Sequence, residues 1–476
     1  MPPKKKRIRP SLVVAYLLTW FAIPHVLLAR KRPTATLAWV WGIIAVPFAG
    51  PIAYFMFGAD RMQRKRLRKA ARLGMLRHRG SKLVKEKVEE LPPSESELVR
   101  VLTNISRIPP STADSVRLLI DSAQFYPALR DAIINARHHI HVEFFIWRED
   151  EYGREFLDLL VDAARRGVQV RLLLDQIGCF GMRRSFFAPL LEAGGRFSWF
   201  YSLPLWRHSR FMNLRNHRKL QIIDGNVGFV GGMNMGREYA GHDEDLGAWR
   251  DAQMEVRGPV VNTLQEMFAE DWFFATNEVF TGDAYHTSWA RNERSHVVQV
   301  IAGGPDLPRE PIPKSIVALL GSARSRLWLT TGYFVPDHLF LTALQLCAAR
   351  GVDVRLLVSA RTDHPYLLEI GRSFYEDLLQ WGVRVFEYSE GMNHKKCMLL
   401  DEEWLMVGSA NSDNRSMRLN FELNLLAHAP KQAEELEQLL CREFEMSKEI
   451  LLEQFSKRPL GRRLLEAALR PLAPLL

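Results

Sequence analysis

Apolar residues follow two different patterns along this chain. Near the N-terminus they form two long stretches, residues 11–29 and 35–58, and neither stretch contains Lys, Arg, Asp or Glu. A helix needs about 20 residues to cross the hydrocarbon core of a bilayer. We therefore predict that residues 1–60 form a two-helix transmembrane hairpin with a short turn over residues 30–34.

Two alternatives to this hairpin stay open. The five cations before the first stretch are typical of a secretory signal peptide, but a second apolar stretch follows after only five residues and no small-residue cleavage pattern stands out. The other alternative is a hairpin buried in the core of a folded domain.

Beyond residue 110, apolar residues come in short runs separated by periodic stretches. The segment RGVQVRLLL, residues 166–174, returns as RGVDVRLLV, residues 350–358, and each copy follows a stretch with helical periodicity. A strand-like run precedes each copy, at residues 140–147 and 327–334. Alternating strands and helices are typical of an α/β fold with a largely buried sheet, and their repetition indicates a duplication.

The domain boundaries follow from this repeat. We predict two α/β domains, residues 111–300 and 301–476. Residues 61–110 are expected to form a basic juxtamembrane segment followed by a linker, because residues 91–110 combine prolines with polar side chains.

The net charge of +10 is unevenly divided between these parts. Residues 1–90 hold 20 Lys and Arg against 4 Asp and Glu, a net of +16, and the rest of the chain holds 44 against 50, a net of −6. A mildly acidic body argues against a nucleic-acid partner, because phosphate contacts need many cations. The nine cations within residues 61–79 are suited instead to an anionic phospholipid bilayer, where each adds about 1 kcal/mol of attraction.

The same cations predict the orientation in the membrane. They lie on both sides of the hairpin, so the positive-inside rule places both of its ends in the cytoplasm. We expect a multi-pass protein of the cytoplasmic (inner) membrane whose body lies on the cytoplasmic side.

We expect no cofactor and no metal. Four cysteines without CxxC spacing argue against a disulfide framework and a cysteine zinc site, and the chain has no Walker or GxGxxG segment. His138, His139 and His141 form a compact histidine cluster, but at the start of a strand these are interpreted as solvated or core histidines.

The candidate chemistry lies in a second repeat. The segments NHRKLQIID, residues 216–224, and NHKKCMLLD, residues 393–401, share the pattern HxKxxxxD. Each has an Asn 17 residues after its His, Asn234 or Asn411, preceded by GGM in the first copy and GSA in the second. Four fixed positions that recur once in each half are a specific signal.

Strand geometry explains this spacing. Residues two apart point to the same face of a strand, so His217 shares a face with Lys219, and His394 shares one with Lys396. Each pair offers a nucleophile or proton carrier beside a cation, which disfavours protonation of the imidazole. The remaining motif residues, Asp224 and Asp401, have the opposite parity, and we expect them to support the catalytic pairs by anchoring the turns.

The two HxKxxxxD motifs with their trailing GGxN and GSxN resemble the phospholipase D superfamily. The whole layout, with two N-terminal spans, a basic segment and two such halves, is similar to the bacterial cardiolipin synthases, and the segments GPD at 304–306 and YFVPD at 333–337 extend the likeness. Gly232 stands where many members have Ser, so the two half-sites are not expected to be equivalent.

This resemblance implies that both motifs form one shared active site. One imidazole would attack phosphorus to form a phosphohistidine, while the other protonates the leaving alkoxide and later deprotonates the incoming alcohol. By analogy His217 is the nucleophile and His394 the acid and base. The residues expected to bind the non-bridging phosphate oxygens are Lys219, Lys396, Asn234, Asn411 and Ser409.

A carboxylate is expected to orient each histidine through its second ring nitrogen. In the second half Glu422 matches the downstream acid of the superfamily. In the first half Asp251 is the candidate, with Asp245 as its alternative.

The resemblance implies transfer of a phosphatidyl group between two phosphatidylglycerol molecules, which gives cardiolipin and glycerol. A hydrolase of the same superfamily would use identical residues, a nuclease is disfavoured by the acidic body, and a non-catalytic membrane scaffold would not need two intact His/Lys pairs. Residues 202–212 and 462–470 mix apolar residues with cations and are candidates for contact with the membrane interface. The alternatives are a half-buried loop for residues 202–212 and packing on the body for residues 462–470.

Overall fold

The computed structural model describes residues 10–29, 33–55, 86, 88–200, 214–280, 285, 287–290, 292–307 and 309–475. The basic run at 61–79 and the candidate interfacial loop at 202–212 lie outside the described residues. The chain divides into two compact units, one made of Met1–Arg72 with Leu203–Leu214 and the other of Leu73–Ser202 with Arg215–Leu476.

The described residues of the first unit form α1 (Pro10–Leu28), α2 (Pro33–Ala45) and α3 (Ala49–Ala53). The second apolar stretch therefore forms two helices, where one was predicted. The break contains Pro47, which cannot donate a backbone hydrogen bond and disfavours helical geometry in the residue before it. Within the described residues, the structure has no helix with the length and apolar character needed to cross a membrane.

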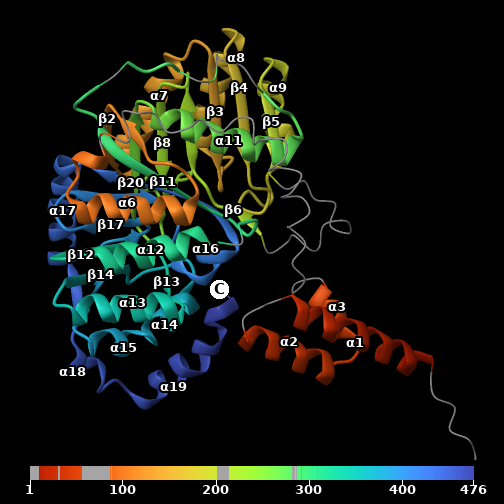
Figure 1. Cartoon of the computed structure of the whole chain (residues 1–476). Helices are drawn as coiled ribbons and strands as arrows, with labels where there is room; N and C mark the ends of the chain where they lie inside the picture. Colours follow the sequence, from red (N-terminus) through yellow and green to blue (C-terminus); the bar gives the residue numbers. More distant parts are fainter. Residues whose placement is uncertain are drawn as a thin grey trace, which may run out of the picture. The chain divides into compact units, whose positions relative to one another are not determined.

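The second unit contains two α/β halves, each built around a mixed sheet (Figure 1). The first sheet has the order β2-β10-β8-β7-β3-β4-β5, in which β3, β4 and β5 run parallel. Its strands are β2 (Ser115–Ile120), β3 (His139–Phe144), β4 (Gln169–Leu174), β5 (Arg196–Trp199), β7 (Leu220–Ile223), β8 (Val227–Gly231) and β10 (Ala252–Arg257). Its main helices are α7 (Asp121–Ile134), α8 (Glu151–Arg165), α9 (Ala188–Glu192) and α11 (Val260–Thr276).

The second sheet repeats this plan with additional strands, in the order β1-β11-β20-β18-β17-β12-β14-β15-β21. The strands are β1 (Ser111–Ala113), β11 (His296–Gly303), β12 (Arg326–Thr331), β14 (Asp353–Ser359), β15 (Arg384–Tyr388), β17 (Cys397–Leu400), β18 (Trp404–Gly408), β20 (Asn420–His428) and β21 (Ser447–Ile450). The helices are α12 (Pro311–Ser322), α13 (His338–Ala349), α14 (Pro365–Arg372), α15 (Tyr375–Leu379), α16 (Asn414–Arg418), α17 (Pro430–Glu445), α18 (Leu452–Phe455) and α19 (Leu460–Leu469). The predicted α/β duplication is therefore present.

The segment before the first half differs from the linker that its prolines predicted. It forms α6 (Pro93–Ser106), which begins with a proline in its first turn, where the missing N–H costs nothing. Leu98, Val99 and Leu102 of this helix belong to the core of the second half. Strand β1 likewise pairs with β11, so residues 93–113 complete the second half although they precede the first.

Two short strand pairs join the halves. Strand β6 (Arg215–Asn216) runs parallel to β20, and β16 (Met392–Asn393) runs parallel to β9 (Trp249–Arg250). In each half, the two residues before the motif histidine thus form a short strand that pairs with a strand of the other half. This exchange brings the two motifs together.

Candidate active site

Both motif histidines are fixed where the halves meet. The backbone N–H of His217 donates to the carbonyl oxygen of Phe421 at 2.9 Å, and that of His394 donates to the carbonyl oxygen of Arg250 at 2.8 Å. Both side chains are buried, with 8% and 4% of the residue exposed. The structure therefore brings the two predicted histidines into one shared region, each held by the backbone of the other half.

Each imidazole is bonded to a carboxylate from the opposite half. Nδ1 of His217 lies 3.0 Å from both carboxylate oxygens of Glu422, and Nδ1 of His394 lies 2.6 Å from Oδ2 of Asp251. We had assigned each carboxylate to the histidine of its own half, and this pairing was wrong. The strand exchange is the cause, because β6 runs beside the strand that carries Glu422 and β16 runs beside the strand that precedes Asp251.

These hydrogen bonds define the reactive atom. A carboxylate on Nδ1 holds the proton there, so Nε2 is left as the nitrogen that can attack or accept a proton. Burial lowers the pKa of His217 to about 4, helped by Lys219 and opposed by Glu422. Burial, with Lys396, lowers the pKa of His394 to about 4 as well. Both imidazoles are therefore neutral in the free protein near pH 7.

The two lysines form the cationic part of the site. Nζ of Lys219 donates to the carbonyl oxygen of His217 at 2.8 Å, and Nζ of Lys396 donates to the carbonyl oxygen of His394. Burial lowers the pKa of Lys219 to about 7 and that of Lys396 to about 8, and each of the two pKa values is raised again by Glu422 and Asp251. An anionic phosphate would favour both ammonium forms, as expected of a site built to receive one.

The two carboxylates stay ionised despite their burial. Burial raises the pKa of Glu422, but His217 and Lys219 outweigh it and the pKa is lowered. Burial also raises the pKa of Asp251, and Lys396 and His394 lower it. Ionised carboxylates hold the Nδ1 protons of both histidines and stabilise any imidazolium that forms during a reaction.

Ser409 and Gly232 support these carboxylates in different ways. The hydroxyl of Ser409 donates to Oε2 of Glu422, so the structure places it behind the carboxylate, whereas we expected it at the phosphate. At the equivalent position of the first half, a Cβ on Gly232 would collide with the carboxylate of Asp251. The half with Ser409 carries a glutamate, Glu422, and the half with Gly232 carries the shorter aspartate, Asp251. The two half-sites are therefore chemically different.

The two motif asparagines have different surroundings. Oδ1 of Asn234 accepts from the N–H of Ile146 at 2.9 Å, and its Nδ2 donates to the hydroxyl of Tyr239 at 2.6 Å. Both ends of this amide are engaged with protein, which gives Asn234 a structural role. Asn411 is buried beside Gly332 and His394, and its Oδ1 has no hydrogen-bond partner among the described residues. A phosphate oxygen needs a donor, which is the Nδ2 group of this amide, and Asn411 is the better placed of the two because its amide has no hydrogen bond to protein among the described residues.

Asp224 and Asp401 close the hairpin turns behind each motif. Asp224 accepts from the N–H groups of His138 at 2.7 Å and His139 at 2.9 Å, and Asp401 accepts from that of Ser325 at 2.8 Å. Both have positive φ angles, 55° and 51°. These contacts anchor the turns to β3 and β12, as strand parity indicated. Asp245, the alternative to Asp251, lies exposed on a loop.

Aromatic rings line the site, and sequence reasoning did not assign them to it. The ring of Phe145 lies 4.8 Å from that of His217. The rings of Trp249, Tyr239 and Tyr333 lie 5.1, 5.6 and 6.1 Å from that of His394. They supply the apolar walls that lower the pKa values of the histidines. The chain gives no local signal for them, because their contacts depend on how the halves meet.

The residue between His and Lys in each motif has a separate role. Arg218 is buried against Asp271 of α11, and Lys395 lies 2.9 Å from Glu443 of α17. Strand parity turns these cations away from the catalytic face, toward the helix behind the sheet. Both copies of the motif carry a cation at this position, and this repetition is the feature of the sequence that indicates the role.

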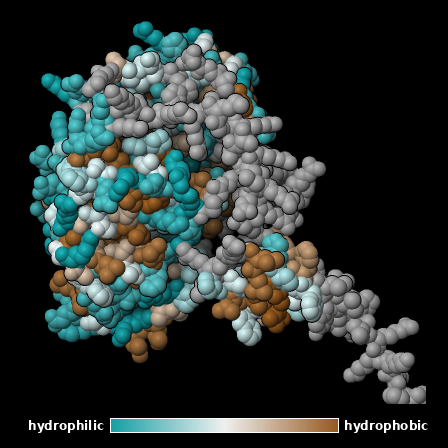
Figure 2. Space-filling view, in the orientation of Figure 1, coloured by the Kyte–Doolittle hydropathy of each residue, from teal (hydrophilic) through white to brown (hydrophobic). Residues whose placement is uncertain are grey.

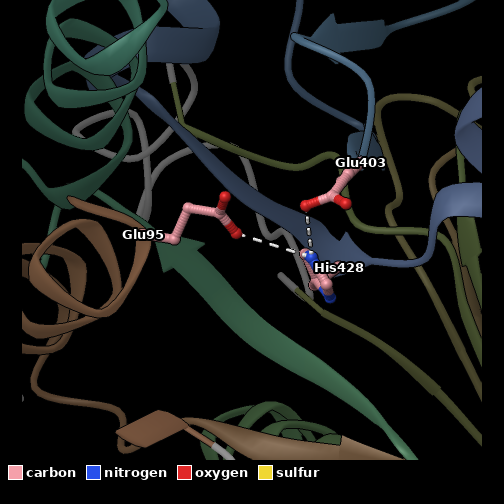
Figure 3. Close-up of side chains that lie close together, drawn as sticks. All are labelled: Glu95, Glu403 and His428. Atoms are coloured by element: carbon pink, nitrogen blue, oxygen red, sulfur yellow. Dashed lines mark hydrogen bonds and ion pairs between the residues drawn. The ribbon is translucent and has the colours of Figure 1, made fainter. Parts of the chain in front are cut away.

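A separate group of side chains has donors suited to a metal ion. Nε2 of His428 lies 3.0 Å from Oε2 of Glu403 and 3.5 Å from Oε2 of Glu95 (Figure 3). His428 ends β20, six residues beyond Glu422, which corresponds to about 20 Å along a strand. In the histidine cluster at the start of β3, the backbone of His138 and His139 binds Asp224, the side chain of His138 is exposed, and His141 is buried and stacks on Phe268. Neither group belongs to the two-histidine site.

Comparison with known proteins agrees with the fold and the motifs. A family model described as "Cardiolipin synthase, PLD-like domain" matches residues 129–272 and 316–444, and one described as "Phospholipase D-nuclease N-terminal" matches residues 17–58. The chain is 35% identical to "Cardiolipin synthase 2" of Bacillus anthracis over 455 residues, which covers 95% of this chain and 88% of that protein. It is 36% identical to "Cardiolipin synthase" of Geobacillus thermodenitrificans over 455 residues, which covers 94% and 90%.

A solved structure shares the fold. The crystal structure of phosphatidylserine synthase from Haemophilus influenzae matches 80% of this chain and 100% of its own, with a TM-score of 0.61 and 16% identity. At this identity the match shows the architecture alone. The family model and the curated relatives go further, and they show that this chain belongs to the cardiolipin synthase family of the phospholipase D superfamily.

Proposed function

We propose that this protein is a phosphatidyltransferase that makes cardiolipin and glycerol from two molecules of phosphatidylglycerol. The observation that carries this proposal is the pair of neutral, buried imidazoles, each bonded through Nδ1 to an ionised carboxylate of the opposite half. Family membership over nearly the whole chain supports the same activity.

The first step is displacement at phosphorus. Nε2 of His217 attacks the phosphorus of one phosphatidylglycerol, a P–N bond forms, and the P–O bond to the headgroup glycerol breaks. His394 donates the proton from Nε2 that turns the departing alkoxide into glycerol. The phosphate is anionic, so its presence raises the pKa of His394 from the low value of the free site and favours the protonated form that this step needs.

The second step returns the site to its starting state. His394, now neutral, accepts the proton of a headgroup hydroxyl from a second phosphatidylglycerol, and that oxygen attacks phosphorus. The P–N bond breaks, which frees His217 and releases cardiolipin. Lys219, Lys396 and the amide of Asn411 are proposed to bind the non-bridging oxygens, where negative charge increases in both transition states.

We also propose that the N-terminal helices anchor the protein in the cytoplasmic (inner) membrane, with both ends of the hairpin in the cytoplasm. Their surfaces support this, since Trp20, Leu28 and Trp41 are 76%, 81% and 67% exposed, and apolar residues form part of the face of these helices that Figure 2 shows. Apolar surface of this extent requires an apolar partner. Both substrates are lipids, so an anchor keeps the enzyme where they are.

Product analysis tests the proposed reaction. Purified protein in phosphatidylglycerol vesicles is expected to produce cardiolipin and glycerol in equal amounts. Substitution of His217 or His394 by Ala is expected to abolish both products. Phosphatidic acid as the dominant product would contradict the proposal and identify a hydrolase, because the same residues would then pass the phosphatidyl group to water.

A further inference from the structure

The C-terminal helix α19 contacts the body with its polar side inward. Its buried residue is Glu466, which is 1% exposed and accepts a hydrogen bond from Nε of Arg458 at 2.9 Å. A helix that packs on a protein core normally buries its leucines and exposes its charges. Here Leu469, at the end of the helix, packs on the core of the second half, but the leucines nearer its start do not take part in that core.

The leucines nearer the start of this helix lie on the outside. Leu460, Leu464 and Leu465 are 68%, 60% and 50% exposed, and Leu472, just beyond the helix, is 44% exposed. Apolar residues reach the surface at the lower edge of the body in Figure 2, where Figure 1 places the start of α19. A contiguous apolar surface of this kind marks a binding site for another apolar surface.

Cations accompany these leucines. Arg462 and Arg463 lie on the same helix and are exposed, and Arg462 also forms an ion pair with Glu369 of α14 at 3.2 Å. The rest of the body is mildly acidic, so arginines among exposed leucines are a local feature. Leucines that enter the acyl region and arginines that remain at the headgroups are the composition of a helix that lies in an anionic lipid interface.

The leucine surface is connected to the active site by aromatic rings. Tyr366, 47% exposed, lies on α14, the helix against which α19 packs. Its ring is 5.7 Å from that of His364, which is 6.0 Å from that of Tyr333, and Tyr333 is 6.1 Å from His394. Tyr366, on the helix that α19 contacts, is therefore three ring contacts from His394.

The first half has a matching apolar tip. Phe180, 89% exposed, lies in the loop after β4, close in sequence to Arg183 and Arg184. At the start of this loop, Asp175 accepts from the N–H of Asn216, the residue before His217, at 2.7 Å. Ser359, at the end of β14 and before α14, accepts in the same way from the N–H of Asn393 at 3.0 Å. Phe180 and Tyr366 thus come from equivalent segments, after β4 in the first half and after β14 in the second.

We propose that α19 and the Phe180 loop form a docking surface for an anionic phospholipid bilayer, which places the opening of the active site at the level of the lipid headgroups. The arginines favour this occupant over a second copy of the chain, because a symmetric contact through the leucines would bring the arginines of both copies together, whereas anionic headgroups attract them. This proposal depends on the proposed function in one respect, which is that the substrates are lipids. It goes beyond that function by identifying the face of the catalytic body that contacts the bilayer.

A depth measurement on the full-length protein tests this docking surface. A nitroxide is attached at Leu464→Cys, or at Ile134→Cys as control, in a Cys441→Ser background, and the protein is reconstituted in nanodiscs of phosphatidylglycerol and phosphatidylcholine. Ile134 is 49% exposed at the end of α7 and is followed by the amino end of β3. The Phe180 loop follows the carboxyl end of the parallel strand β4, so Ile134 lies at the other end of these strands. The label at 464 is expected to collide more with oxygen than with a polar nickel reagent, and the label at 134 is expected to show the reverse.

Equal accessibilities at the two positions would overturn the docking surface, and so would spin–spin coupling between two labels at 464, which identifies a second copy as the occupant. Failure of the proposed function is recognised separately, because it appears as loss of cardiolipin formation by the unlabelled protein.

An activity comparison provides the second test. The double variant Leu464→Asp with Leu465→Asp is expected to make cardiolipin at least about tenfold more slowly in nanodiscs, since charged residues weaken insertion. Its rate on a short-chain phosphatidylglycerol dissolved as monomers should equal that of the parent. Ile134→Asp should leave both rates unchanged. Equal rates of the double variant and the parent in nanodiscs would contradict the proposal, and loss of the monomer reaction would show a catalytic or folding role of α19 instead.

Discussion

At the scale of single residues, Asp251 and Glu422 determine how the histidines react. Each carboxylate holds a proton on Nδ1 of the motif histidine of the opposite half. The carboxamide of Asp251→Asn or Glu422→Gln can donate to Nδ1 and would move the proton to Nε2, the atom that must react. We expect turnover to fall by about 10²- to 10⁴-fold with the fold retained. Asp245→Asn, on an exposed loop, is the control, and turnover near the parent rate in Asp251→Asn would contradict this role.

The buried ionisable groups also predict a pH dependence. His217 has a lowered pKa of about 4, so its neutral, nucleophilic form is present above that pH and is lost as pH falls through it. Lys219 has a lowered pKa of about 7, so its phosphate-binding ammonium is present below that pH and is lost as pH rises. We expect kcat/KM to increase as pH rises through about 4 and to decrease at higher pH, above about pH 7 where the Lys219 ammonium limits the rate and at lower pH where the His394 proton of the first step limits it.

Lys219→Arg identifies the group behind the alkaline decrease. Arg stays protonated, so this variant is expected to shift the decrease to higher pH, even where its maximal rate is lower. An alkaline limb at the same pH in the variant and the parent would assign the decrease to another group.

We predict that Gly232 is needed for activity, because any larger residue there would displace the carboxylate of Asp251. A Cβ at this position collides with the carboxylate of Asp251, so Gly232→Ala should displace Asp251 from His394 and lower kcat. Gly321→Ala is the matched control, because a Cβ there meets nothing within 4 Å. Parent activity in Gly232→Ala, measured as cardiolipin formed per minute, would show that Asp251 can move without consequence.

At the scale of secondary-structure elements, buried ion pairs fix each motif strand to the helix behind it. Lys395 and Glu443 are 0% and 1% exposed and link the start of β17 to α17. Lys395→Met leaves Glu443 buried with only the more distant Arg250, and we expect a loss of about 3–5 kcal/mol in the free energy of unfolding. Combining it with Glu443→Leu should restore most of this loss, as chemical denaturation can measure.

The exposed pair Lys457 and Glu453 is the matched control. Its atoms are 2.8 Å apart, against 2.9 Å in the buried pair, but both of its side chains are exposed. Lys457→Met should change stability by less than about 1 kcal/mol. Similar losses in Lys395→Met and Lys457→Met would show that burial of the pair does not matter.

The elements also show what sequence patterns can predict. Apolar runs and periodicity predicted the alternation of β3, α8 and β4, and of β12, α13 and β14, because each pattern is local. Strand parity correctly separated the His/Lys faces from Asp224 and Asp401. The prolines at 92 and 93 were interpreted as part of a linker although they begin α6, because only packing against the second half shows that a helix forms there.

At the scale of the whole molecule, the active site exists because two similar halves exchange short strands. A repeat specifies the geometry inside each half, but it does not specify how one half docks on the other. For this reason the motif residues were predictable from the sequence, whereas the crossed pairing of His217 with Glu422 and of His394 with Asp251 was not. The aromatic walls around His394, contributed by Tyr239 and Trp249 of one half and Tyr333 of the other, depend on the same docking.

The shared site assigns the covalent step to one half and the proton transfer to the other. The most direct test is acid-quench trapping with phosphatidylglycerol labelled in its phosphate, followed by mapping of the labelled peptide. In the parent protein the label is expected on His217, and His394→Ala is expected to lower it, because this variant lacks the acid that formation of the phosphohistidine needs. Label on His394 would reverse the two roles. Absence of label on any histidine while cardiolipin still forms would contradict the two-histidine mechanism.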